Sequence, residues 1–189
     1  MTTFAVNADR LAETFETLVK IDSVSRNERA VCEKLKEIFE DLGGTTVVDG
    51  AAEKVNGNCG NLIVRFDGDK AIPPLLLSAH MDTVEPGNNI EPVLKDGVFV
   101  SRGETILGAD DKSAIAIIIE AMRVLRESGA LHCPLELVFT VCEEIGLLGA
   151  KHLDFGLISA TTGYVLDASD TTGIITRAPA ANRLDFVVR

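Results

Sequence analysis

Two segments near the start of the chain carry apolar residues at the spacing of an α-helix. The first covers residues 7–20, with Asn7 as the expected N-cap. Its apolar face consists of Leu11, Phe15, Leu18 and Val19. The second helix is expected to begin after Asn27 and to end at Gly43. Its apolar positions are Val31, Leu35, Ile38, Phe39 and Leu42.

Shorter apolar runs predict strands in the next part of the chain. Residues 45–48 and 61–66 are expected to form two strands separated by a polar loop. The run over residues 75–79 is almost entirely apolar, which is typical of a parallel strand under helices on both faces. Residues 92–102 read as a hairpin that turns at Asp96.

Helices and strands alternate in the second half of the chain. A long helix, apolar on most sides, is expected from Asp110 to about Ser128, where Gly129 ends it. A strand over residues 135–142 and a short helix over 146–152 follow. The last predicted strands are 163–166 and 173–176. This alternation predicts an α/β fold, a three-layer αβα sandwich with a mixed, mostly parallel sheet and helices on both faces.

The composition restricts the functional class. Twenty-nine acidic against 18 basic residues give a net charge of −11, which argues against nucleic-acid partners and anionic membrane surfaces. Charged residues near the N-terminus argue against a signal peptide, and no apolar stretch reaches membrane-spanning length, so we expect a cytoplasmic protein. The four cysteines form no CxxC pair and are expected to be reduced rather than zinc ligands.

His80 and Asp82 directly follow the apolar strand over residues 75–79. The period of a strand points both side chains the same way, at the carboxyl end where open α/β sheets place their sites. A lone histidine is more often structural, but this position beside a carboxylate favours a metal ligand. A metal-bound imidazole commonly donates its other N–H to a carboxylate, a role that Asp82 could fill.

Asp110 and Asp111 stand where the long helix begins. Aspartate is a favoured N-cap and stabilises the positive end of the helix dipole, and we expect this structural role for Asp111. The small residues Gly108 and Ala109 indicate a close approach of the backbone to a site. We therefore expect Asp110 to be a metal ligand.

Glu143 and Glu144 follow the predicted strand over residues 135–142. Adjacent carboxylates at the end of a buried strand are costly unless a cation or a shared proton compensates them. One could bind a metal while the other acts as a general base; two exposed glutamates that open a helix are the alternative. Asp167 ends its strand in the same way, whereas Asp170 is expected in a turn. One histidine and four carboxylate positions at the ends of apolar segments predict a metal site.

These motifs, in this order and with these separations, resemble the metal-site motifs of the dizinc exopeptidases. That superfamily includes tripeptidases of the peptidase T type, glutamate carboxypeptidase, succinyl-diaminopimelate desuccinylase and aminoacylase, and the peptidase T branch is the most similar. The segments that carry the resemblance are His80-Met81-Asp82-Thr83-Val84, Gly108-Ala109-Asp110-Asp111-Lys112, Glu143-Glu144-Ile145-Gly146 and Tyr164-Val165-Leu166-Asp167.

The resemblance implies the metal ligands. Asp110 would bridge two metal ions, His80 and Asp167 would complete the protein ligands of one ion, and Glu144 would bind the other. The implied cofactor is zinc, two ions for each complete active site, with cobalt or manganese as replacements.

The resemblance also implies the reaction. Glu143 would be the general base that deprotonates a water between the metal ions, and Asp82 would hold His80. The activity implied is that of a zinc metallopeptidase that hydrolyses the peptide bond after the N-terminal residue of a short peptide. The alternatives are an N-acyl amino acid deacylase or a carboxypeptidase of the same superfamily, or a non-catalytic metal-binding fragment.

The chain departs from the family at its end. The family's last metal ligand is a histidine in a later part of a longer chain, and neither His132 nor His152 matches its motif. Residues 184–188 begin a strand-like alternation without a turn or a partner. We expect residues 1–178 to be the first part of the catalytic domain and 179–189 the start of a lid or dimerisation domain. Such a fragment, natural or engineered, is expected to be weakly active or inactive and to self-associate or form a homodimer.

Overall fold

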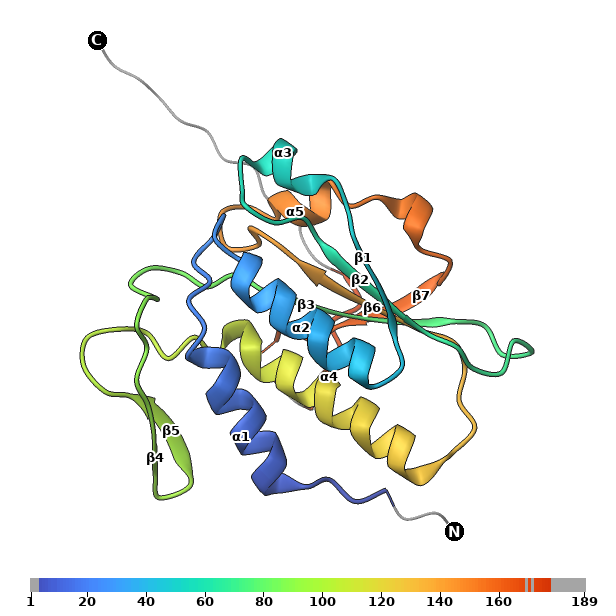
Figure 1. Cartoon of the computed structure of the whole chain (residues 1–189), viewed down its shortest axis with the longest axis horizontal. Coiled ribbons are helices and arrows are strands. Elements are labelled where there is room, and N and C mark those ends of the chain that lie inside the picture. The colour runs from blue at the N-terminus through green and yellow to red at the C-terminus, as the bar shows by residue number, and fades with distance from the viewer. Residues whose placement is uncertain (1–3, 169, 171, 178–189) are drawn as a thin grey trace.

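A five-stranded sheet forms the centre of the molecule in the computed structural model, which describes residues 4–168, 170 and 172–177 (Figure 1). In sheet order, the strands are β1 (Thr45–Val48), β2 (Leu62–Phe66), β6 (Leu135–Thr140), β3 (Leu75–His80) and β7 (Thr162–Val165). β2 is antiparallel to both of its neighbours, while β3 is parallel to β6 and β7. Only β2 therefore runs against the common direction, and the predicted mixed, mostly parallel sheet is confirmed.

Three helices lie over one face of this sheet (Figure 1). They are α1 (Ala8–Val19), α2 (Arg29–Asp41) and α4 (Ala109–Ser128). The predicted cap of α1 is present, since the side chain of Asn7 accepts the N–H of Arg10, and α4 ends at the left-handed Gly129. Alternate strand residues point into the core against the apolar faces of these helices; they include Leu62, Val64, Leu137, Phe139 and Ala79.

The opposite face of the sheet is covered by a thinner layer, residues 148–160. This layer contains the short helix α5 (Leu148–Lys151) and the 3₁₀ turn η1 (Phe155–Leu157). Arg65 of β2 donates to the carbonyl oxygen of Leu157, and Glu136 of β6 accepts the N–H of Ser159 at 3.0 Å. Helical layers on both faces agree with the predicted sandwich.

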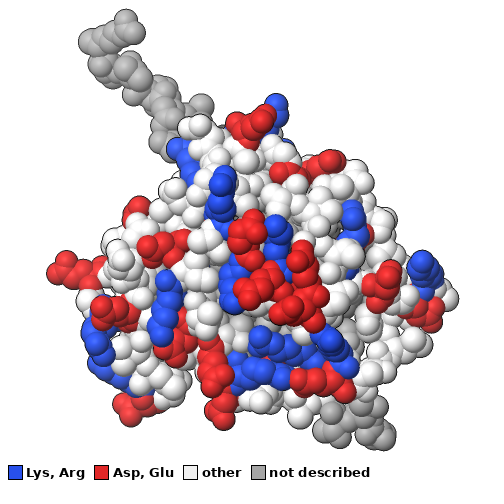
Figure 2. Space-filling view, viewed as in Figure 1, with Lys and Arg blue, Asp and Glu red and all other residues white. Residues whose placement is uncertain are grey.

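The outer surface of α1, α2 and α4 is charged. Figure 2 shows basic and acidic side chains intermixed over this face. Several of them pair along a helix, such as Lys34 with Glu37 at 2.7 Å. Such exposed pairs contribute little to stability, so the helices are held mainly by their apolar inner faces.

Two details of the fold differ from the sequence-based expectations, two expectations lie outside the described residues, and the predicted hairpin is present. The polar loop predicted before β2 contains a helix, α3 (Ala51–Val55). Residues 173–176 form no strand: no described segment pairs with them, and Ile174 and Ile175 are 77% and 75% exposed. The expected alternation at 184–188 and the boundary at 178 lie outside the described residues. The predicted hairpin is confirmed as β4 (Pro92–Lys95) and β5 (Val98–Ser101).

None of the described helices combines the length and the apolar character needed to cross a membrane.

Candidate metal centre

The candidate ligands come together because three neighbouring parallel strands end at one edge of the sheet. β3 ends at His80, which lies opposite Thr140 near the end of β6. Glu143 and Glu144 follow β6, and Asp167 follows β7 on the other side of β3. The carboxyl ends of parallel strands meet at one edge of a sheet, and this is where α/β proteins place their sites. The candidate ligands therefore gather at the carboxyl ends of the strands, as the sequence predicted.

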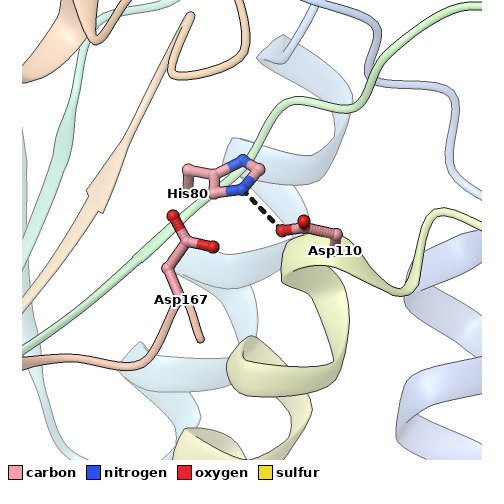
Figure 3. Close-up of side chains that lie close together, drawn as sticks. All are labelled: His80, Asp110 and Asp167. Atoms are coloured by element: carbon pink, nitrogen blue, oxygen red, sulfur yellow. Dashed lines mark hydrogen bonds and ion pairs between the residues drawn. The ribbon is translucent and has the colours of Figure 1, made fainter. Parts of the chain in front are cut away.

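His80 is the common member of two groups of ligand atoms. Figure 3 shows the carboxylates of Asp110 and Asp167 close to its ring, and its Nε2 lies 3.0 Å from Oδ1 of Asp110. One ligand atom from each of these three residues lies within 4.8 Å of the other two. The same limit holds for the group of His80, Glu143 and Glu144. The structure thus brings together all five residues for which a metal-binding or base role was expected.

Asp82 lies beside His80, but most of its bonds go to other groups. Nδ1 of His80 donates to the backbone carbonyl oxygen of Asp82 at 2.9 Å, while the nearest carboxylate oxygen is 3.4 Å away. The buried carboxylate accepts the hydroxyl of Ser25 at 2.6 Å and the N–H groups of Glu143 at 2.9 Å and Glu144 at 3.2 Å. Asp82 therefore orders the backbone of both glutamates as well as the surroundings of the imidazole.

Asp111 has a structural role, as predicted, but the predicted capping of α4 was wrong. Its side chain makes no capping hydrogen bond to α4; it is 3% exposed and accepts the N–H of His80 at 3.2 Å. The reason is that Asp110 and Asp111 both have non-helical backbone angles, so regular helix begins only after them. Asp111 therefore points back to the end of β3 and leaves the exposed side chain of Asp110 beside His80.

The carboxylates of the site favour a bound cation. Burial and the negative charge of neighbouring groups raise the pKa of Glu143, Glu144 and Asp167. Burial also raises the pKa of Asp111 to about 7. A divalent cation among these groups would offset both causes and keep the carboxylates ionised.

The surroundings of His80 also favour positive charge. Burial of the ring lowers its pKa, but the adjacent carboxylates, first Asp82 and then Asp110, outweigh burial and raise the pKa of His80 to about 10. The imidazole therefore lies in an environment that strongly prefers positive charge. One imidazole nitrogen with several carboxylate oxygens is a donor set that suits zinc, so the residues present fit the metal that the resemblance implies.

Two supporting residues carried no recognisable signal in the sequence. Ser25 and Glu28 lie in the polar segment between α1 and α2, with no apolar period around them. Their contacts near the metal centre are with residues more than fifty positions away, as in the bonds from Ser25 to Asp82 and from Cys142 to Glu28. A hollow of about 450 Å³ between α1, α2 and α4 is separate from the metal centre. It includes Arg123 and Arg126, at the other end of α4 from Asp110.

The fold and the arrangement of this site are those of a metallopeptidase family. The chain belongs to peptidase family M28, whose sequence profile matches residues 61–161. It is 43% identical over 175 residues to the Bacillus subtilis (strain 168) protein YqjE, described as uncharacterized, covering 92% of this chain and 47% of YqjE. Peptidase T of Escherichia coli O9:H4 (strain HS) is 26% identical over 201 residues, with 84% of this chain and 48% of peptidase T covered.

Two solved structures are similar to this chain in fold and in sequence. The aminopeptidase PepT of Bacillus cereus ATCC 10987 superposes with a TM-score of 0.85 at 42% identity, over 87% of this chain and 44% of PepT. A tripeptidase of Staphylococcus aureus subsp. aureus Mu50 gives a TM-score of 0.84 at 42% identity, over the same shares of 87% and 44%. The predicted resemblance to peptidase T-like metallo-exopeptidases is confirmed. This chain spans about half the length of the curated relatives it matches.

Proposed function

We propose that this chain is the N-terminal part of a zinc-dependent aminopeptidase of the tripeptidase type, which releases the N-terminal residue of short peptides. The observation that carries the proposal is the position of His80. It forms one group of ligand atoms with Asp110 and Asp167 and a second group with Glu143 and Glu144. Adjacent ligand groups of this kind suit a pair of neighbouring divalent cations. The 42% identity to an aminopeptidase and to a tripeptidase supports the substrate class.

The ligands divide between two cations in this proposal. His80, Asp110 and Asp167 would hold one zinc ion, and Asp110 and Glu144 would contribute to the second. When bound, the metal would supply a Lewis acid for the scissile carbonyl and a water of lowered pKa. Asp110 suits the shared position because its side chain is 70% exposed and projects from the start of α4 toward His80.

Glu143 would act as the general base. Its carboxylate lies within 4.8 Å of the ligand atoms of His80 and Glu144, close enough to reach a water held among them. It would take a proton from that water and deliver it to the leaving amine. Its backbone N–H is bound to Asp82 at 2.9 Å, which fixes the position from which its side chain reaches the site.

The proposal is tested with the complete gene product that contains this chain, loaded with zinc or cobalt. Tripeptides, dipeptides and N-acetyl amino acids are supplied in parallel, and released amino acids are quantified. We expect release of the N-terminal residue from tripeptides. Hydrolysis of N-acetyl amino acids without hydrolysis of tripeptides would point instead to a deacylase of the same superfamily. Zinc binding without hydrolysis of any of these substrates would contradict the proposed activity.

A further inference from the structure

Glu28 is a fully buried carboxylate outside both groups of candidate ligands. It lies immediately before α2, and its side chain is 0% exposed. Its Oε1 accepts the N–H of Arg26 at 2.9 Å, the N–H of Cys142 at 3.0 Å and the thiol of Cys142 at 3.4 Å. Its Oε2 has no hydrogen-bond partner among the described residues. Burial of a carboxylate with one unpaired oxygen is costly, so the bonds to Oε1 must offset a large part of that cost.

Both residues that donate a backbone N–H to Glu28 have a left-handed conformation. The φ angle is 77° for Arg26 and 52° for Cys142. Residues other than glycine adopt this conformation at a steric cost and keep it only where their surroundings hold them. The carboxylate of Glu28 accepts the N–H groups of both residues and so helps to hold both in the left-handed conformation.

Cys142 is the residue that leads from β6 into the metal centre. The next two N–H groups, those of Glu143 and Glu144, donate to the two carboxylate oxygens of Asp82 at 2.9 and 3.2 Å. Three successive amides therefore donate to two buried carboxylates, Glu28 and Asp82. With the backbone fixed on this side, the side chains of Glu143 and Glu144 are left to face His80.

We infer that Glu28 is a positioning residue of the metal centre, which holds Cys142 in its left-handed conformation and so orients Glu143 and Glu144 toward the cation. The described hydrogen bonds of the Glu28 side chain go to Arg26 and Cys142 and to none of the candidate ligands, so it acts through the backbone of residue 142. Because Asp82 binds the amides of Glu143 and Glu144 and also lies against His80, displacement of this segment disturbs both ligand groups. The inference rests on the proposed function, since it requires that the site bind a metal.

The test is a zinc titration of the chain and of two variants of Glu28, by calorimetry or by competition with a chelating dye. Glu28→Met keeps the approximate volume and removes the acceptor, and we expect zinc affinity to fall about 10- to 100-fold, as for other residues that support metal ligands. Glu28→Gln keeps one acceptor oxygen, and we expect a smaller loss. The absorption bands of the cobalt-loaded chain should change in both variants, because the ligand geometry changes.

Glu136 provides the matched control. It is another buried glutamate, 4% exposed, and accepts the N–H groups of Ser159 and Ala160 at the opposite end of the sheet. Glu136→Met and Glu136→Gln should lower thermal stability and leave zinc affinity and the cobalt spectrum unchanged. Glu28 variants that behave like these controls would overturn the positioning role.

A second-site variant tests the mechanism and does not depend on Glu28→Met being folded. Glycine adopts a left-handed conformation without steric cost, so Cys142→Gly should restore most of the zinc affinity that Glu28→Gln loses. No recovery in the double variant would contradict action through residue 142. Failure of the wild-type chain to bind zinc would instead overturn the proposed metal centre itself, and the two failures are therefore distinguishable.

Discussion

The imidazole of His80 lies closer to the backbone carbonyl of Asp82 than to its carboxylate. Nδ1 of the ring lies 2.9 Å from the carbonyl oxygen of Asp82 and 3.4 Å from its nearest carboxylate oxygen. The ring orientation therefore depends on the path of the backbone after β3. The carboxylate remains free to accept the amides of Glu143 and Glu144 and the hydroxyl of Ser25.

This arrangement predicts that Asp82→Ala displaces Glu143 and Glu144 more than it displaces the ring of His80. The variant leaves three donors without an acceptor, and we expect a loss of about 2–4 kcal/mol in the free energy of unfolding. We also expect zinc affinity to fall about 10- to 100-fold. Urea unfolding and zinc titration measure the two effects. Ser25→Ala removes one of the three donors and should show a much smaller change in both; equal losses in the two variants would argue against this role for Asp82.

The two adjacent glutamates are predicted to respond differently to the same substitution. In the complete gene product, Glu143→Gln should lower kcat about 10²- to 10⁴-fold while metal content is retained, because a general base is lost. Glu144→Gln should reduce metal content, because a ligand is lost. Metal analysis together with tripeptide assays checks both. Loss of metal in Glu143→Gln with retention in Glu144→Gln would mean that the two roles are reversed.

The contact between α1 and α4 is predicted to make the chain sensitive to acid. Hydrogen bonds from Arg10 hold the pKa of Glu120 below its usual range, and this carboxylate is 2% exposed. Its folded-state pKa is lowered, so the stabilisation is present above the unfolded pKa, near pH 4, and is lost as pH falls through the folded value. Arg10→Met should cost about 1–3 kcal/mol at pH 7 and reduce the difference in stability between pH 7 and pH 3. An unchanged pH dependence in urea unfolding would contradict this.

The outer edge of strand β7 is predicted to mediate self-association. β7 is the last strand on its side, no described strand pairs with its outer edge, and Tyr164 and Val165 are 50% and 70% exposed. An uncovered edge strand is a template for pairing with a second copy. We expect dimers or larger species in size-exclusion chromatography with light scattering at tens of micromolar, and a shift toward monomer in Val165→Lys. A wild-type monomer at this concentration would show that the chain covers this edge itself.

Most of the fold was predictable because its elements have strong local patterns. The apolar positions of α1, α2 and α4 recur at helical spacing, and β3 and β6 are short apolar runs between turn signals. α3 was not predicted because five residues contain too little of a helical period to recognise. The strand expected over residues 173–176 was wrong because a short apolar run does not make a strand by itself: it needs a neighbouring strand to exchange hydrogen bonds with, and none of the described strands lies beside it.

The candidate ligands were also predictable, because each stands at the end of an apolar segment and the topology gathers those ends. The supporting residues that contact the backbone next to these ligands were not predictable. Asp111 was assigned a local capping role, but its carboxylate accepts the amide of His80, thirty-one positions earlier. Glu28 reaches Cys142 across 114 positions. Such long-range contacts of buried carboxylates leave no periodic trace in a single sequence, and only the folded backbone reveals them.

The most direct test of the metal centre is zinc binding by the chain and by His80→Ala. His80, Asp110 and Asp167 offer the first ion three protein ligands, a usual number for a catalytic zinc site, whereas Asp110 and Glu144 alone offer the second ion only two carboxylates. Isothermal titration should therefore show one tight zinc ion with the second weak or unbound. His80→Ala should abolish the tight site, because His80 belongs to both groups, while the exposed control His152→Ala should bind zinc as the wild type does. Zinc binding that survives His80→Ala, or a wild-type chain that binds no zinc, would contradict a metal centre at the end of β3.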